Sequence, residues 1–196
     1  MPNWTNNVVT LKHTDPAMVA KAAKGLVDGT LLNDFIPIPA ELTESEASFS
    51  DANADKNKAN IEKYGYASWW DFAVNEWGTK WDISPYGSEI SDDGLSVEGS
   101  FDTAWSPPTE AYRKLEELGF TVEALYYEPG MAFCGEYSDG QDVTYEIPES
   151  SDEVLEVIPS HIDEAFAIAE NMSAWEEENA EDEDDTPYDF GQSNLV

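Results

Sequence analysis

Few side chains in this sequence can act as an acid, a base or a metal ligand near neutral pH. The chain of 196 residues has two histidines, His13 at the end of a segment with strand-like alternation and His161 at the start of an expected helix. Neither has a nucleophilic side chain beside it in the sequence, which favours a structural role for both. The sequence also lacks the short motifs of serine hydrolases, P-loop and Rossmann nucleotide sites, and zinc proteases.

The single cysteine, Cys134, lies between Phe133 and Gly135 in an expected strand, with no histidine or cation next to it. A reactive thiol normally needs an electropositive setting, so we expect an inert side chain that is buried or half-buried. One cysteine can form no internal disulfide and no Cys/His zinc site, which indicates a reducing compartment. We therefore expect no catalytic residue, no cofactor and no metal site.

Negative charge dominates the composition, with 42 Asp or Glu against nine Lys or Arg and a net charge of −33. The last cation is Lys114, and 24 acidic residues follow it. Such a chain repels phosphate backbones and anionic lipids and attracts basic surfaces, so we expect no direct nucleic-acid binding and no membrane binding. The N-terminus lacks the pattern of a signal peptide, and no stretch has the ~20 apolar residues of a membrane span. A cytoplasmic location is expected.

Hydrophobic periodicity and turn residues predict the elements of the first half of the chain. A strand is expected first, then a helix that starts at Asp15-Pro16 and stops at Gly29. The expected elements after them are an extended connection (31–42), an exposed insertion with one short helix (41–63), a helix (66–77), a short strand (79–83), a turn-rich segment (84–94) and a strand (95–101).

In the second half of the chain, the same patterns predict a helix that begins at Ser106-Pro107-Pro108, an antiparallel meander, and a last helix that starts with a capping box at Ser160. The expected meander strands are residues 120–127, 131–137 and 141–147. The order of elements predicts an α+β, ferredoxin-like split β-α-β core with an inserted helical segment, a C-terminal meander and a final helix. We expect one domain over residues 1–175 and an acidic, flexible tail over residues 176–196.

Three stretches of rare residues stand in a distinctive order: Met1-Pro2-Asn3-Trp4, the segment from Trp69 to Asp82, which ends in Trp77-Gly78-Thr79-Lys80-Trp81-Asp82, and Phe101-Asp102-Thr103-Ala104-Trp105-Ser106-Pro107-Pro108. Together they resemble the YubB-type family of phage and plasmid proteins, over roughly residues 1 to 127. Many members carry a cysteine after the first motif, where this chain has Thr5. The resemblance implies a ferredoxin-like domain and an origin on a mobile genetic element, and it supplies no catalytic residues.

The tryptophan-rich motifs allow two interpretations. Tryptophans on both sides of a tight turn usually close a hydrophobic core. Alternatively, they line a pocket in which flat apolar faces combine with polar contacts. The residues of this pocket are Trp77, Lys80, Trp81, Asp82 and Trp105, with Asp102 as a further polar contact.

A ferredoxin-like sheet packs one face on its helices and leaves the other open, and we expect that open face to be negative. The expected partner-binding residues are Glu98, Glu123, Glu136, Asp142 and Glu146 on the sheet, with Glu176, Glu177 and Glu178 at the start of the tail. This pattern favours a nucleic-acid mimic that binds a basic host protein, such as a nuclease, a defence protein or a DNA-binding protein. The alternatives are a small-molecule binder or enzyme that uses the tryptophan-rich turn, an acidic protein of a halophile, and a passive virion component.

Overall fold

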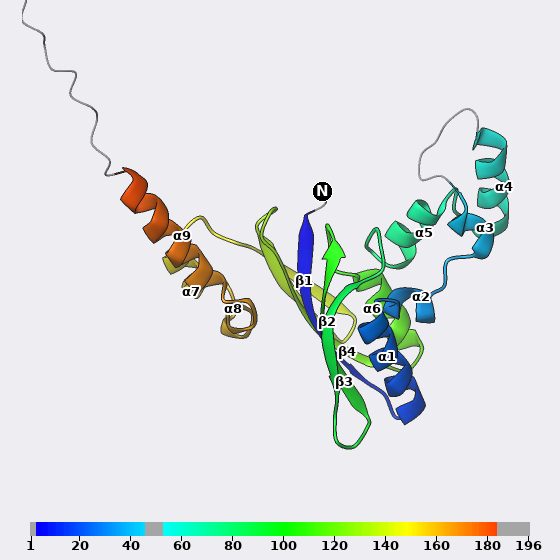
Figure 1. Cartoon of the computed structure of the whole chain (residues 1–196), viewed down its shortest axis with the longest axis horizontal. Helices are drawn as coiled ribbons and strands as arrows, with labels where there is room; N and C mark the ends of the chain where they lie inside the picture. The colour runs from blue at the N-terminus through cyan, green and yellow to red at the C-terminus, as the bar shows by residue number, and fades with distance from the viewer. Residues whose placement is uncertain (1–2, 46–52, 184–196) are drawn as a thin grey trace, which may run out of the picture. The chain divides into compact units, whose positions relative to one another are not determined.

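The computed structural model describes residues 3–45 and 53–183. Its centre is a six-stranded antiparallel sheet in the order β2-β3-β1-β4-β5-β6 (Figure 1). The strands are β1 (Trp4–Lys12), β2 (Ser84–Ile90), β3 (Ser96–Ala104), β4 (Thr121–Glu128), β5 (Phe133–Ser138) and β6 (Gln141–Glu146).

Four of these strands form the predicted split β-α-β core. Helix α1 (Pro16–Asp28) follows β1, and helix α6 (Thr109–Glu117) connects β3 to β4. The order β2-β3-β1-β4 places β1 and β3 side by side in the middle, as in a ferredoxin-like domain. Strands β5 and β6 extend the sheet beyond β4 through tight hairpins, so the ferredoxin-like fold and the meander are confirmed.

Within residues 3–146, the helices lie on one side of the sheet (Figure 1). The Asp15 side chain caps α1 by accepting the Ala17 N–H at 2.9 Å, and Gly29 ends it in a left-handed conformation, as predicted. The remaining helices of this part are α2 (Leu31–Phe35), α3 (Ala40–Thr43), α4 (Ala54–Tyr64) and α5 (Trp69–Glu76).

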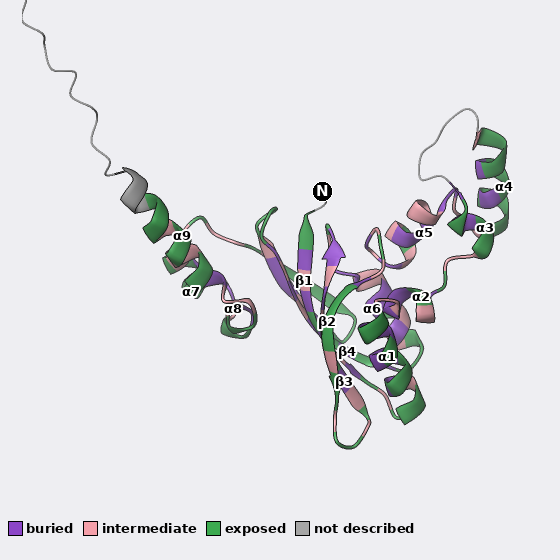
Figure 2. Cartoon of the chain, viewed as in Figure 1, coloured by how far each residue is buried: buried purple, intermediate pink, exposed green. Residues whose placement is uncertain are grey.

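The hydrophobic core lies between these helices and one face of the sheet (Figure 2). Val9 and Leu11 of β1 are fully buried there against Leu26 of α1 and Leu115 of α6. The other face of the sheet carries the alternate residues of each strand, and Val8 is 37% exposed on it. We call this the open face, since none of the helices described within residues 3–45 and 53–146 covers it.

Two segments between α1 and β3 differ from expectation. Residues 79–83 form bends and irregular backbone instead of a strand, because the side chains of Thr79 and Asp82 bond backbone groups of other segments. The strand β2 lies instead in the segment predicted to be turns, and a bulge between Pro85 and Gly87 interrupts its pairing. The bulge hides the alternation by which a strand is recognised in a sequence.

The connection predicted to be extended contains α2 and α3, with Pro37 and Pro39 between them. The predicted insertion at 41–63 contains α4, whose Asn57 and Asn60 are buried, and residues 46–52 of it lie outside the described residues. Helix α5 begins later than predicted, because Ser68 caps it by accepting the Asp71 N–H.

Contacts divide the chain into two compact units, residues 1–146 and 147–196. The second unit contains α7 (Ser151–Val157), α8 (Ser160–Phe166) and α9 (Ile168–Glu183). Where a single final helix was predicted, Ala167 adopts a left-handed conformation that separates α8 from α9. The predicted domain boundary at residue 175 falls inside α9, and most of the predicted tail, residues 184–196, lies outside the described residues.

Candidate functional site

A line of carboxylates crosses the open face of the sheet. Glu89 of β2 is paired with Glu98 of β3, and Thr10 of β1 lies between Glu98 and Glu123 of β4. All three glutamates are exposed. Because neighbouring strands lie about 4.8 Å apart, this line spans about 14 Å of surface. We call Glu89, Glu98 and Glu123 the acidic row.

The next line of residues along the open face is partly apolar. Val8 is paired with Leu125 of β4, which in turn is paired with Glu136 of β5. Hollows of about 360 and 430 Å³ lie on either side of Val8. Glu89 and Glu98 line the first hollow, and Glu123 and Glu136 line the second. Each hollow therefore combines an apolar wall with two carboxylates, a setting that fits the stem and the charged end of a long cationic side chain.

Positive charge on this face is sparse. Among the strand residues that the structure describes there, Lys12 is the one cation, and its ammonium lies 2.8 Å from the Glu123 carboxylate. Asp102 adds a further carboxylate, which accepts hydrogen bonds from the Asn6 amide at 2.7 Å and from the Tyr86 hydroxyl. The bond to Asp102 raises the pKa of Tyr86. The open face is therefore strongly negative, with five carboxylates against one ammonium.

Two of the predicted partner-binding residues do not lie on this face. Asp142 is paired with Tyr137, whose side chain is buried in the core, so Asp142 and Glu146 lie on the helix side of the sheet. Asp142 accepts a hydrogen bond from the Tyr126 hydroxyl at 2.6 Å. The prediction was wrong because the two-residue turn Asp139-Gly140 sets which face each residue of β6 occupies.

The predicted acidic residues of the second unit have separate roles. The Glu176 carboxylate accepts the Ser151 N–H at 2.8 Å and the Ser151 hydroxyl at 2.7 Å, so it binds the first turn of α7. These hydrogen bonds lower the pKa of Glu176. Glu177 and Glu178 are exposed on α9. The Glu176 carboxylate therefore stabilises the pairing of α7 with α9.

The predicted tryptophan pocket separates into structural and surface residues. Trp77 is 3% exposed and donates its indole N–H to the Ile36 carbonyl at 2.9 Å, so it closes the core. Asp82 accepts the Leu32 N–H at 3.0 Å and the Asn33 N–H at 2.9 Å, and it thereby caps α2. Desolvation raises the pKa of Asp82, although these backbone donors oppose the shift.

The other three predicted residues of this pocket meet on the surface together with Trp4. The Trp4 and Trp81 ring centroids lie 6.1 Å apart, and the Lys80 ammonium lies 4.4 Å from the Trp81 centroid and 5.0 Å from that of Trp105. The three indoles are 38–41% exposed. We call Trp4, Trp81 and Trp105 the tryptophan cluster. It brings together all three motifs that were distinctive in the sequence.

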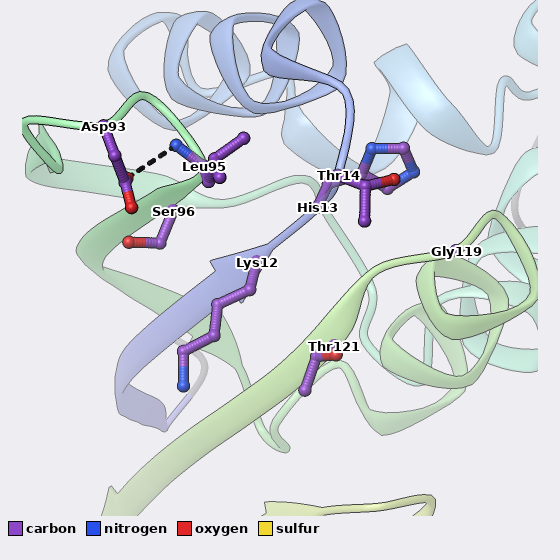
Figure 3. Close-up of a pocket in the computed structure, with 8 residues that line it drawn as sticks. All are labelled: Lys12, His13, Thr14, Asp93, Leu95, Ser96, Gly119 and Thr121. Atoms are coloured by element: carbon purple, nitrogen blue, oxygen red, sulfur yellow. Dashed lines mark hydrogen bonds between the residues drawn. The ribbon is translucent and has the colours of Figure 1, made fainter.

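A separate hollow of about 400 Å³ lies beside His13, at the end of β1 (Figure 3). The ring of His13 accepts the Asp15 N–H at Nδ1, at 2.9 Å, and its Nε2 lies 3.3 Å from the Leu118 carbonyl. Backbone groups therefore engage both ring nitrogens. Lys12 and Asp93 also line the hollow, and Asp93 is bonded to the Leu95 N–H at 3.0 Å. This arrangement favours the predicted structural role of His13.

Cys134 is buried, as predicted. Within residues 3–45 and 53–183, no cluster of histidine, cysteine or carboxylate side chains has the arrangement of a metal site. None of the helices described there is long and apolar enough to cross a membrane. Sequence reasoning missed Glu89, which fell in the segment predicted to be turns. The bulge between Pro85 and Gly87 removes the alternation that would have revealed its strand.

Comparison with known proteins identifies one family. A family model described as the ferredoxin-like domain in Api92-like protein matches residues 80–190. Among solved structures, the crystal structure of protein api92 from Yersinia pseudotuberculosis is similar to the chain, with a TM-score of 0.36 and 10% sequence identity over 76% of this chain and 99% of that one. The comparison with curated proteins found no match.

Proposed function

The chain belongs to the family with the ferredoxin-like domain of Api92-like proteins, and we propose that it uses the open face of this domain to bind a basic protein as a mimic of nucleic acid. The partner is a nucleic-acid-binding protein of the host, such as a nuclease or a defence protein. In this proposal the chain is an accessory protein of a phage or plasmid, of the YubB type, and acts in the cytoplasm of the host without catalysing a reaction.

The observation that carries the proposal is the acidic row. Glu89, Glu98 and Glu123 come from three different strands and lie on one line across a rigid sheet. A fixed array of carboxylates attracts a basic groove before contact and keeps its geometry on binding. Flexible acidic residues offer the attraction without the geometry.

The charge of the first unit supports the same proposal. Residues 1–146 hold 26 of the 42 acidic residues and all nine Lys or Arg, so their net charge is −17. The excess is therefore not confined to the C-terminal segment. An anionic mimic of nucleic acid needs this charge on its folded body, because a basic groove recognises phosphates by their fixed positions.

The test uses a protein that the immobilised chain retains from host lysate at about 50 mM salt and releases at about 500 mM salt. The proposal expects duplex DNA to displace this protein and the double variant Glu98→Gln/Glu123→Gln to bind it at least roughly tenfold more slowly. The matched control, Glu62→Gln/Glu117→Gln, removes the same charge from exposed helix positions and leaves the rate near that of the wild type.

Two results contradict the proposal. Equal effects of the two double variants would show that net charge alone matters and that the open face is not the contact. Unfolding on removal of salt would favour adaptation to a salty cytoplasm, in which carboxylates serve hydration and solubility. Thermal melts across the same salt range separate this alternative from mimicry.

A further inference from the structure

The tryptophan cluster is an unusual feature of the surface. Trp4, Trp81 and Trp105 come from three distant parts of the sequence, and each leaves about 40% of its surface exposed. Large aromatic side chains usually bury more than this, and grouped exposed ones are typical of binding hot spots. The cluster therefore points to a contact with another molecule.

The backbone at Trp105 supports this interpretation. Its φ of +73° lies in the left-handed region, which a bulky side chain rarely adopts. The Trp105 N–H donates to the Asn3 carbonyl at 2.9 Å, and this bond ties the strained residue to the chain just before Trp4. Strain of this kind persists where the surrounding structure enforces it, often at ligand-binding sites.

The cluster adjoins the open face. Trp4 begins β1 and alternates onto the same side as Asn6, and the Asn6 amide bonds the Asp102 carboxylate at 2.7 Å. On β3 the residues of the open face alternate, so Asp102 is followed on this face by Ser100 and then by Glu98. A partner seated on the acidic row can therefore reach the indoles without leaving the face.

The chemistry of the cluster favours a cation. Indole faces attract cations, and the Lys80 ammonium already lies within 5.0 Å of the Trp81 and Trp105 centroids. The field of the first unit, with a net charge of −17, draws further cations to this surface. We infer that the cluster binds an arginine side chain of the basic partner, with Lys80 as the resident cation that the guanidinium displaces. This inference rests on the proposed function and adds a hot spot to the same face.

Arginine fits this site better than lysine. A guanidinium is planar, stacks on aromatic rings and is weakly hydrated, so it loses little on leaving water. An ammonium is compact and strongly hydrated, and it gains less from an indole face. The acidic row attracts both cations by charge alone, whereas the tryptophan cluster should distinguish between them.

The test compares two peptides of equal length and charge, one with arginine and one with lysine at every basic position, titrated onto the full chain by calorimetry. We expect the arginine peptide to bind roughly 3- to 30-fold more tightly. The variant Trp81→Leu should remove most of this preference, and Trp81→Tyr should restore part of it. In Glu98→Gln/Glu123→Gln, both peptides should bind more weakly by similar factors, and the preference should remain. Circular dichroism melts confirm that each variant is folded.

The variant Lys80→Met should change the affinity for the arginine peptide in a direction that a general loss of folding cannot produce. It removes the competing cation while keeping an unbranched apolar side chain, so the arginine peptide should bind more tightly. Weaker binding by a variant that circular dichroism shows to be folded would overturn the inference. If wild type binds the arginine and lysine peptides equally tightly, and Trp81→Leu does the same, the inference is overturned but the proposed function stands. If neither peptide binds at low salt, the proposed function itself is contradicted.

Discussion

Glu89 of β2 and Glu98 of β3 lie directly opposite each other on the open face of the sheet. Like charges at such a cross-strand position repel each other and destabilise the pair of strands. Both side chains are exposed, so water and salt weaken the repulsion without removing it. The fold therefore bears an unfavourable contact at the place where the proposed function needs negative charge.

Replacement of one partner tests this cost. Glu89→Gln should raise the free energy of unfolding by about 0.2–1 kcal/mol at low salt, because it removes the cross-strand repulsion. The gain should shrink in 1 M salt, where charges are screened over about 3 Å. Urea denaturation at both salt concentrations measures it. The control Glu149→Gln, at an exposed position outside the helices and strands, should not stabilise to the same extent, and an equal gain there would attribute the effect to net charge.

Two glycines of the sheet should differ sharply in their tolerance of alanine. A Cβ at Gly135 would lie 2.3 Å from the Tyr126 hydroxyl and 2.3 Å from the Val143 carbonyl, and the second of these belongs to the backbone. Gly135→Ala should therefore cost about 1–3 kcal/mol or more. Gly87→Ala meets no atom within 4 Å and should be nearly neutral. Thermal melts of the two variants decide the point, and similar losses would contradict the packing described around Tyr126.

The strain at Trp105 predicts a reversal of the usual order of glycine and alanine. Trp105→Gly should be more stable than Trp105→Ala by about 1 kcal/mol, since glycine adopts a positive φ at no steric cost. Trp81 has no positive φ, so at that position alanine should be the more stable replacement. Guanidinium denaturation of the four variants gives the comparison. If the alanine variant is more stable than the glycine variant at both positions, the result argues against strain at Trp105.

The half-buried carboxylate of Asp82 predicts a dependence of stability on pH. Its pKa is raised above 3.8, mainly by desolvation, so the folded state holds this proton more tightly than the unfolded state. Its contribution to stability is complete below the unfolded pKa and falls as the pH rises through the raised value. The free energy of unfolding of wild type minus that of Asp82→Asn should therefore decrease between pH 4.5 and 7. A difference that increases over this range would contradict the prediction.

Local signals in the sequence predicted much of the fold correctly. Asp15 and Gly29 mark the ends of α1 because capping depends on neighbouring backbone groups alone. The meander was recognisable because Asp139-Gly140 supplies a tight turn between two alternating segments. The strand β2 was missed because its bulge breaks the period of two, and the irregular backbone at 79–83 was missed because Asp82 bonds residues about 50 positions away.

By itself, the sequence determined the ferredoxin-like order of elements and the excess of negative charge, since both follow from residue types and from periods of a few residues. Only the tertiary structure decided which carboxylates share a surface. Strand pairing put Glu89 beside Glu98, a two-residue turn moved Asp142 to the other face, and chain reversal brought Trp4, Trp81 and Trp105 together. These relationships depend on register and on contacts between distant segments, and local periodicity contains no information about either.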